Sequence, residues 1–187
     1  VFTNRDYEPY ATERDTEVQQ LLNNNNVDFE TFKDQVIFEK NEVTKKDGLP
    51  YVVYTPYMKV WKEKFKTYNL DFFYTSSFLQ HLVKDKELPN LSLSDIGFTA
   101  ATQKVTAHIV SPSLIQNYED TRNYPAQDAT SKVGPHLRFG TVSIRKMVEK
   151  AITEKNEIFW QELIWREFFM QILWHFPKTS KSSFKAK

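Results

Sequence analysis

One apolar segment, Asn156 to Phe176, constrains the fold of this chain more than any other feature. Placed at about 100° per residue, its apolar side chains cover most of the circumference of a helix. These side chains are Ile158, Phe159, Leu163, Ile164, Phe168, Ile172, Leu173 and Phe176. A helix with this pattern needs packing partners on more than one side. The segment is therefore predicted to be a largely buried helix.

Four residues that include two charged groups share one stripe of the same helix. Glu162, Trp165, Arg166 and Phe169 fall together at helical spacing. Charges on a buried helix are costly unless they are paired. One interpretation is an ion pair between Glu162 and Arg166 beside core aromatic rings. The other is the wall of a pocket for a flat ligand with polar edges, and the helix alone does not decide between them.

Composition narrows the class of protein. The chain has 187 residues, 40% of them hydrophobic, which suits one domain or one domain with part of another. It has no cysteine, so disulfides, thiolate catalysis and cysteine zinc sites are excluded. No apolar run reaches the roughly 18 residues of a membrane span, and no secretory leader is visible. We expect a cytoplasmic protein, and because the chain starts at Val1 we expect a piece of a longer one.

Charge is distributed unevenly along the chain. Residues 1–25 carry two basic and five acidic side chains, whereas residues 130–150 carry five basic side chains and one acidic one. Four lysines, at positions 178, 181, 185 and 187, follow near the end of the sequence. This asymmetry permits an anionic partner, nucleic acid included, for the C-terminal half.

The N-terminal region shows an α/β pattern. We predict a strand at Val1–Asn4, a helix at Tyr10–Asn23, a turn of helix at Phe29–Lys33 and a strand at Gln35–Phe38. A strand, a helix and a second strand in that order are typical of a parallel sheet. Two strands do not make a stable sheet by themselves.

The remaining chain is predicted to be mainly helical. An amphipathic helix is expected at Pro56–Tyr68, because Tyr57, Val60, Trp61 and Phe65 share one face. Residues 71–117 give mixed signals and are predicted to be a linker that crosses a surface, and a helical pattern follows from residue 117.

A polar loop with two hydroxyl side chains and a lysine precedes Gly134 and Pro135. Thr130 and Ser131 are predicted to cap a helix whose first turn holds Pro135. The alternative is a phosphate site, because helix N-termini with hydroxyls and Lys132 nearby accept phosphates. The glycine spacing matches neither a P-loop nor a dinucleotide fingerprint.

Other common catalytic patterns are missing from the sequence. The four histidines at positions 81, 108, 136 and 175 lack metal-ligand spacing, so no metal site is expected. No Ser/His/Asp order and no carboxylate pair indicates hydrolytic or glycosidic chemistry. A reaction of this chain would therefore depend on a cofactor.

Four segments in order resemble the DNA photolyase/cryptochrome family, most closely its class I cyclobutane pyrimidine dimer photolyases. They are Asn4–Tyr10, Tyr51–Tyr57, Thr130–Gly140 and Phe159–Phe169. The resemblance covers essentially the whole chain. It implies the end of an α/β antenna domain with a Rossmann-like parallel sheet at residues 1–45, an interdomain linker with a helix at 46–116, and the first part of a helical FAD-binding domain at 117–187, with the second half of that domain missing.

The resemblance also implies roles for individual residues. Tyr118 and the loop Thr130, Ser131, Lys132, Val133 and Gly134 would contact FAD, chiefly at its phosphates, with Phe159 and Arg166 lining the pocket. Family members often carry arginine in place of Lys132, serine in place of Gly134 and tryptophan in place of Phe159. Arg122 would contact a DNA phosphate, and the lesion pocket would be lined by Glu162, Trp165, Arg166 and Phe169.

The implied activity is light-driven repair of cyclobutane pyrimidine dimers in DNA, a carbon–carbon lyase reaction in which reduced FAD donates an electron. Glu162 and Trp165 would be the catalytic residues, the first hydrogen-bonding the dimer and the second packing against it. The alternative is a cryptochrome, a flavin photoreceptor that commonly lacks one or both of these residues. We expect a monomeric whole protein, no activity of these residues alone, and no methenylfolate antenna in the usual site, because Tyr10-Ala11 replaces the Asn-Glu of folate-using members.

Overall fold

The structure, a computed structural model, describes residues 1–84 and 90–184 and divides into two compact units. The larger unit comprises Val1–Leu70 and His108–Lys187, and the smaller one comprises Asp71–Ala107. Lys185 and Lys187 of the basic tail lie outside the described residues. Each unit is described by itself.

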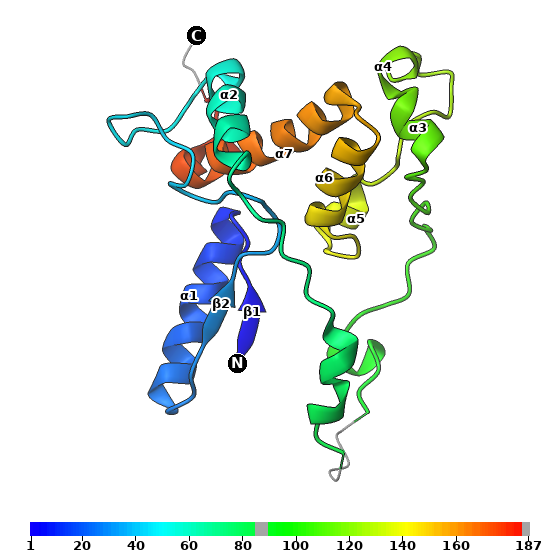
Figure 1. Ribbon diagram of the computed structural model, residues 1–187. Coiled ribbons are helices and arrows are strands. Elements are labelled where there is room, and N and C mark those ends of the chain that lie inside the picture. The colour runs from blue at the N-terminus through cyan, green and yellow to red at the C-terminus, as the bar shows by residue number, and fades with distance from the viewer. Residues whose placement is uncertain (85–89, 185–187) are drawn as a thin grey trace. The chain divides into compact units, whose positions relative to one another are not determined.

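The larger unit begins with a strand, a helix and a second strand. Strand β1 (Phe2–Asn4) precedes helix α1 (Pro9–Asn24), and strand β2 (Glu30–Phe32) pairs with β1 in parallel, with Phe2 opposite Glu30 (Figure 1). Proline suits the start of α1 because the first helical amides have no partner within the helix. The predicted first strand, the helix and the parallel α/β pattern are confirmed.

The predicted position of the second strand is wrong. Residues 30–32, expected within a helical turn, form β2, whereas Gln35–Phe38 is irregular. This segment is nevertheless buried, with Ile37 fully inaccessible to solvent. Its amide groups do not join a ladder, because the N–H groups of Ile37 and Phe38 donate to the side-chain carboxylate of Glu167. The apolar run thus packs as a core loop whose polar groups are satisfied by a distant helix.

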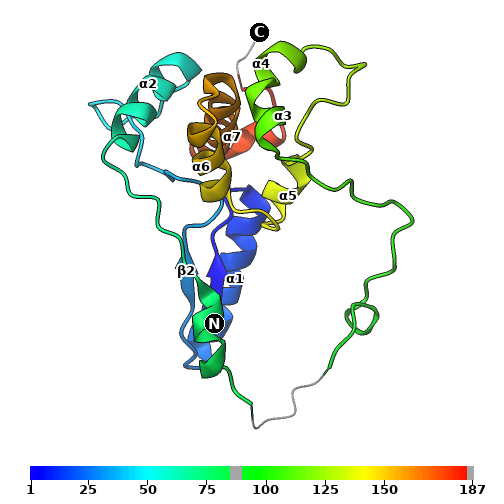
Figure 2. The ribbon, with the colours of Figure 1, turned by 45° about the vertical axis from the view of Figure 1, so that its right-hand side comes forward.

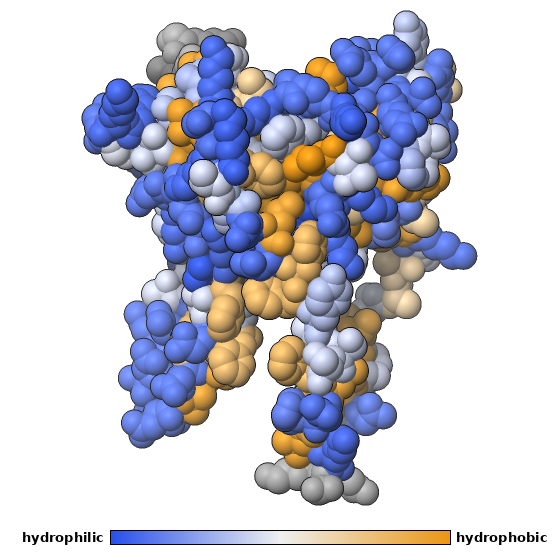
Figure 3. All heavy atoms as spheres, viewed as in Figure 1, coloured by the Kyte–Doolittle hydropathy of each residue, from blue (hydrophilic) through white to orange (hydrophobic). Residues whose placement is uncertain are grey.

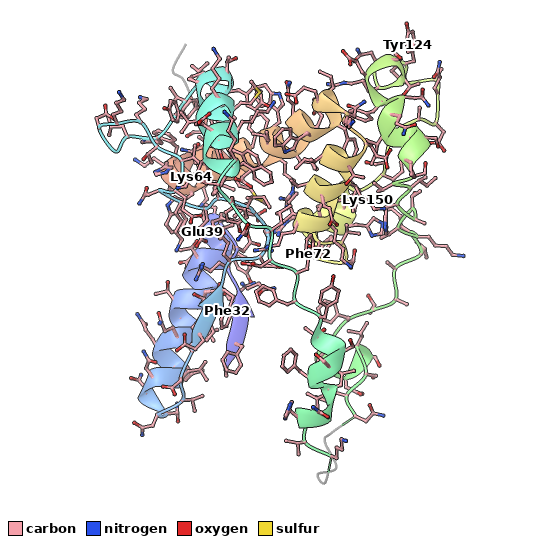
Figure 4. The ribbon with its side chains drawn as sticks, viewed as in Figure 1. Phe32, Glu39, Lys64, Phe72, Tyr124 and Lys150 are labelled. Atoms are coloured by element: carbon pink, nitrogen blue, oxygen red, sulfur yellow. The ribbon has the colours of Figure 1, made fainter. Side chains whose placement is uncertain are left out.

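The two strands leave apolar side chains in contact with solvent. Phe2 is 77% exposed and Phe32, labelled in Figure 4, is 51% exposed. Their ring centroids lie 6.0 Å apart. Helix α1, in contrast, buries only Ala11 and is largely hydrophilic on its surface, as the contrast between blue and orange atoms in Figure 3 shows.

The helical part of the larger unit is arranged around one long helix, α7 (Glu157–His175). It packs against α2 (Tyr54–Phe65), α4 (Tyr118–Thr121), α6 (Ile144–Thr153) and the 3₁₀ turn η3 (Pro177–Ser180), as Figures 1 and 2 show for α2 and α6. The prediction that this helix is buried on more than one side is confirmed. Two shorter helices, α3 (Pro112–Gln116) and α5 (Gly134–Arg138), complete the unit.

Local sequence accounts for the limits of α7 and α2. Asn156 caps α7, since its side chain accepts a hydrogen bond from the amide of Phe159 at 2.8 Å. The predicted helix at Pro56–Tyr68 is confirmed, although α2 starts two residues earlier and ends at Phe65. Its residues Tyr57 and Trp61 are each 1% exposed and form the centre of the core with Ile164 of α7.

The described residues of the smaller unit, 71–84 and 90–107, have little regular structure. They include two 3₁₀ segments, η1 (Thr75–His81) and η2 (Ser94–Ile96), and neither buries a side chain. Several of its apolar residues are exposed, including Phe73 at 80%.

Candidate functional site

The exposed face of α7 carries three of the four residues of the predicted stripe. Phe169 is 60% exposed, the side chain of Glu162 is 36% exposed, and Trp165 is half-buried between them. Arg166 instead turns inward and donates to the carbonyl oxygens of Gln35 at 2.6 Å and Leu137 at 3.3 Å. Burial lowers the pKa of its guanidinium. Three residues of the stripe therefore form an aromatic and acidic surface, and the fourth, Arg166, points into the protein on the other side of the helix.

The partner of Glu162 is Arg122, so the interpretation in which Glu162 and Arg166 form an ion pair is wrong. Arg122 follows α4, and its guanidinium forms an ion pair with the Glu162 carboxylate. The same guanidinium lies 5.6 Å from the centre of the Tyr118 ring. Burial raises the pKa of Tyr118, and the negative charge of Glu162 adds to this shift. The short helix α4 thus delivers both a cation and an aromatic ring to the face of α7.

Tyr118 also contacts Phe159 on the first turn of α7. Their ring centroids lie 5.1 Å apart at an interplanar angle of 89°, an edge-to-face contact. Phe159 itself is buried, with 3% of its surface exposed. Four residues with predicted roles, Tyr118, Arg122, Phe159 and Glu162, are therefore brought together where α4 meets α7.

Trp165 is held by a tyrosine for which the sequence suggested no role. The rings of Trp165 and Tyr54 stack with centroids 3.5 Å apart and planes 9° from parallel. Phe169 makes a second near-parallel contact with Trp165, at 5.5 Å and 24°. The Tyr54 hydroxyl donates to the carbonyl oxygen of Gln161 at 3.0 Å. Tyr54 lies in the segment Tyr51–Tyr57 that contributed to the family resemblance, and this was the only signal in the sequence.

The prediction that the loop before α5 caps this helix is wrong. Helix α5 starts at Gly134 after Val133, with Pro135 in its first turn as expected. Ser131 is 7% exposed, and its carbonyl oxygen accepts the amide of Ile109 at 2.9 Å. Lys132 adopts a left-handed backbone conformation with φ 55°, which turns the chain between Ser131 and the helix. The hydroxyl side chains are therefore separated from the helix start.

The polar groups of this loop are nevertheless partly accessible. The ammonium group of Lys132 forms an ion pair with Asp128 at 2.6 Å, and the lysine side chain is 36% exposed. Thr130 is exposed, whereas Val133 is buried in the core. The side chains offer one cation and one hydroxyl at the surface.

Glu167 is the most unusual residue of the site region, and no role was predicted for it. It is 3% exposed and accepts hydrogen bonds from the amides of Ile37 at 2.7 Å and Phe38 at 2.9 Å, and from the indole nitrogen of Trp61 at 2.5 Å. Burial raises its pKa to about 7, although the three N–H donors oppose this shift. The sequence signal for a special role of this residue is a glutamate within a helix that is apolar on most of its circumference.

Charged side chains connect the segment Asn4–Tyr10, the first of the four family-like segments, to the rest of the larger unit. The Arg5 guanidinium pairs with both carboxylate oxygens of Glu39, which is labelled in Figure 4, at 3.0 and 2.8 Å. The Tyr7 hydroxyl donates to the same carboxylate at 2.7 Å. Arg138 of α5 pairs with Asp6 at 2.8 Å and with Glu8 at 3.0 Å. The Arg138 ion pairs join the α/β segment to α5.

No group of three or more His, Cys, Asp and Glu side chains within residues 1–84 and 90–184 is placed to hold a metal ion. Over the same described ranges, no helix is both long and apolar enough to cross a membrane.

Comparison with known proteins assigns the family. The profile of the DNA photolyase family matches residues 1–75. A deoxyribodipyrimidine photo-lyase of Halobacterium salinarum is 29% identical over 100% of this chain and 43% of its own length. The enzyme of the same name from Vibrio cholerae is 28% identical over 97% of this chain and 43% of its own length.

A solved structure supports the fold. The bacterial class III photolyase from Agrobacterium tumefaciens superposes with a TM-score of 0.70 at 22% identity, covering 99% of this chain and 42% of that one. The architecture is a small α/β element with a parallel sheet followed by helices. The chain belongs to the DNA photolyase family. It spans less than half the length of the curated relatives named above.

Proposed function

We propose that this chain forms part of a deoxyribodipyrimidine photo-lyase, an enzyme that uses light to repair cyclobutane pyrimidine dimers in DNA with FAD as its cofactor. The observation that carries the proposal is the exposed face of α7, where Glu162, Trp165 and Phe169 lie beside Arg122. An aromatic surface next to a cation and a carboxylate suits a flat base with a polar edge and a phosphate nearby.

The aromatic part of this face suits a flipped-out dimer. A pyrimidine dimer stacks poorly in the duplex, so extruding it costs less than extruding an intact base. The Trp165 ring is held in place by Tyr54 beneath it, at 3.5 Å, and therefore loses little freedom on binding. Trp165 would pack against the dimer, and Phe169 would extend the same apolar surface.

The charged part of the face would form a hydrogen bond with the dimer and would bind the DNA backbone beside it. Arg122 would contact a phosphate, which weakens its ion pair with Glu162. An ionised carboxylate only accepts hydrogen bonds, so Glu162 would accept the ring N–H that lies between the two carbonyl groups of a thymine. Only a protonated Glu162 would donate to a carbonyl oxygen. Of these two contacts, only donation to a carbonyl oxygen strengthens as the dimer gains an electron and becomes negatively charged during repair.

The residues proposed to hold FAD fit parts of the cofactor. Lys132 and the hydroxyl of Thr130 suit a phosphate, which would compete with Asp128 for the ammonium group. Tyr118 is partly exposed and has the buried Phe159 packed edge-to-face against it, so its ring offers one aromatic face suited to a flat ring. When bound, the reduced flavin of this family supplies the electron that light drives to the dimer. Ser131, Val133, Gly134 and Arg166, also assigned to the pocket by the resemblance, would act by shaping the backbone and core around it.

We further propose the domain division 1–45, 46–116 and 117–187, and a monomeric whole protein of the class I type. A test of the function uses the longest available form of the protein that contains this chain, loaded with FAD. Illumination should restore dimer-containing oligonucleotides to intact pyrimidines, with no repair in the dark. Light-dependent changes in flavin absorption without any repair would favour the cryptochrome alternative.

A further inference from the structure

Glu167 joins three separate segments of the larger unit in its buried centre. Its carboxylate accepts the amides of Ile37 and Phe38 from the core loop and the indole N–H of Trp61 from α2. The glutamate itself lies two residues after Trp165 on α7. A carboxylate in the core that accepts from three donors is a rigid connection, because each donor would lose a buried hydrogen bond on displacement.

A second connection between α2 and α7 lies at Tyr54, two turns of α2 before Trp61. Tyr54 stacks on Trp165 and donates from its hydroxyl to Gln161. Tyr54 and Trp61 lie seven residues apart on α2, a spacing that places both side chains on one helix face. The orientation of this face toward α7 is therefore set at two points, one buried at Glu167 and one at the margin of the exposed surface.

We propose that Glu167 is a positioning residue for the lesion-binding face: by holding Trp61 it fixes α2, and so keeps Tyr54 stacked on Trp165. Glu167 itself would not touch the dimer. This inference rests on the proposed function for its role in repair, but the placement of Trp165 is measurable without DNA or flavin.

Two variants remove the connection from opposite ends. Glu167→Gln keeps the size of the side chain, but its amide group points N–H donors at one or more of the three existing donors. Trp61→Phe keeps an aromatic ring in the core and removes the indole donor together with part of the ring volume. Lys62→Ala is a matched control, because it breaks the ion pair of Lys62 with Glu157 at the outer surface of the same two helices.

The experiment labels the four tryptophans with 5-fluorotryptophan and follows Trp165 by ¹⁹F NMR, with the signal assigned through Trp165→Phe. The Tyr54 ring shifts this signal because of its ring current, and Tyr54→Leu defines the unstacked position. We expect Glu167→Gln and Trp61→Phe to move the Trp165 signal at least halfway to that position. In Lys62→Ala the Trp165 signal should stay unchanged, and the Trp174 signal should stay unchanged in all three variants.

An unmoved Trp165 signal in folded Glu167→Gln or Trp61→Phe protein would overturn the proposal. If Glu167→Gln fails to fold, Trp61→Phe alone decides. In the longer FAD-loaded protein, Glu167→Gln should weaken binding of dimer-containing DNA about three- to tenfold and leave binding of undamaged DNA unchanged. If Trp165→Ala weakens dimer binding and Glu167→Gln does not, the positioning role is wrong while the proposed function stands. If Trp165→Ala also binds normally, the proposed function itself is wrong.

Discussion

Glu162 forms its ion pair with Arg122 of the neighbouring helical segment, although Arg166 lies one helical turn away on the same helix. Arg166 is unavailable because its guanidinium donates to the carbonyl oxygens of Gln35 and Leu137 behind the helix. The pair places a cation at the edge of the aromatic surface. A phosphate contact by Arg122 and lesion recognition by Glu162 are therefore directly linked.

This pairing predicts the effect of Arg122→Ala. The loss of one phosphate contact should weaken binding of damaged and undamaged DNA alike, and should reduce the slope of log affinity against log salt by about 1. The free energy of unfolding should change by less than about 1 kcal/mol, because the pair is partly exposed. Filter binding at several salt concentrations measures the slope. Lys66→Ala, which breaks an exposed ion pair with Glu63, should leave the slope unchanged.

The family resemblance and the helix pattern predicted much of the fold, for identifiable reasons. The apolar residues of α7 repeat at helical spacing over nineteen residues, so neither its type nor its burial was ambiguous. The second strand was misplaced because Val36, Ile37 and Phe38 are the most apolar residues of that region. These three residues are buried, but no local pattern shows that a carboxylate 130 residues away binds their backbone.

The same limit applies to the site. Helical spacing brought Glu162, Trp165 and Phe169 to one surface, as the structure has them. Spacing along one helix does not show which other helix packs there, so Arg122 was not identified as the partner of Glu162 and Tyr54 was not identified beneath Trp165. Both relationships depend on tertiary packing of segments 40 and 111 residues apart.

Glu167 predicts a pH dependence of stability. Burial raises its pKa in the folded state to about 7, above its value in the unfolded chain. The folded state therefore binds more protons between about pH 5 and pH 7, and the free energy of unfolding should fall across that range as pH rises, by up to about 3 kcal/mol. Asp6 and Glu39 have lowered pKa values and act in the opposite direction at lower pH.

Denaturant unfolding at pH 5, 6 and 7 measures this effect. Glu167→Gln cannot ionise, so its stability should be nearly constant across the range, whereas Glu149→Gln, an exposed change on α6, should behave like the unaltered chain. Equal slopes for all three proteins would show that Glu167 does not titrate in this range.

The antenna chromophore provides another prediction. Because Tyr10-Ala11 stands where folate-using members carry Asn-Glu, the longer protein should not retain methenylfolate in that way. Absorption of the purified protein should show the flavin without a stoichiometric folate band in the near ultraviolet. A folate band that survives gel filtration at one equivalent per protein would contradict the prediction.

These 187 residues alone should not hold FAD. The proposed contacts provide a phosphate site at Lys132 and one aromatic face at Tyr118, which leaves most of a flavin ring without a wall. Exposed apolar side chains such as Phe2 and Phe169 should also favour self-association. Gel filtration with added FAD should separate colourless protein from free flavin. Yellow protein with tightly bound flavin would show a more complete pocket.

The lesion affinity and repair yield of Trp165→Ala and Glu162→Ala, in the longer FAD-loaded protein, test the proposed site most directly. Stacking on an aromatic ring contributes about 1–3 kcal/mol per base, so Trp165→Ala should weaken binding of dimer-containing DNA by roughly one to two decades. A hydrogen bond that a protonated Glu162 donates to the dimer contributes about 2 kcal/mol once the dimer carries negative charge, so Glu162→Ala should lower the repair quantum yield more than the affinity. Phe73→Ala, an exposed aromatic change in the smaller unit, should leave both quantities unchanged. Wild-type binding and repair by both site variants would contradict the assignment of this face to the lesion and would favour a cryptochrome.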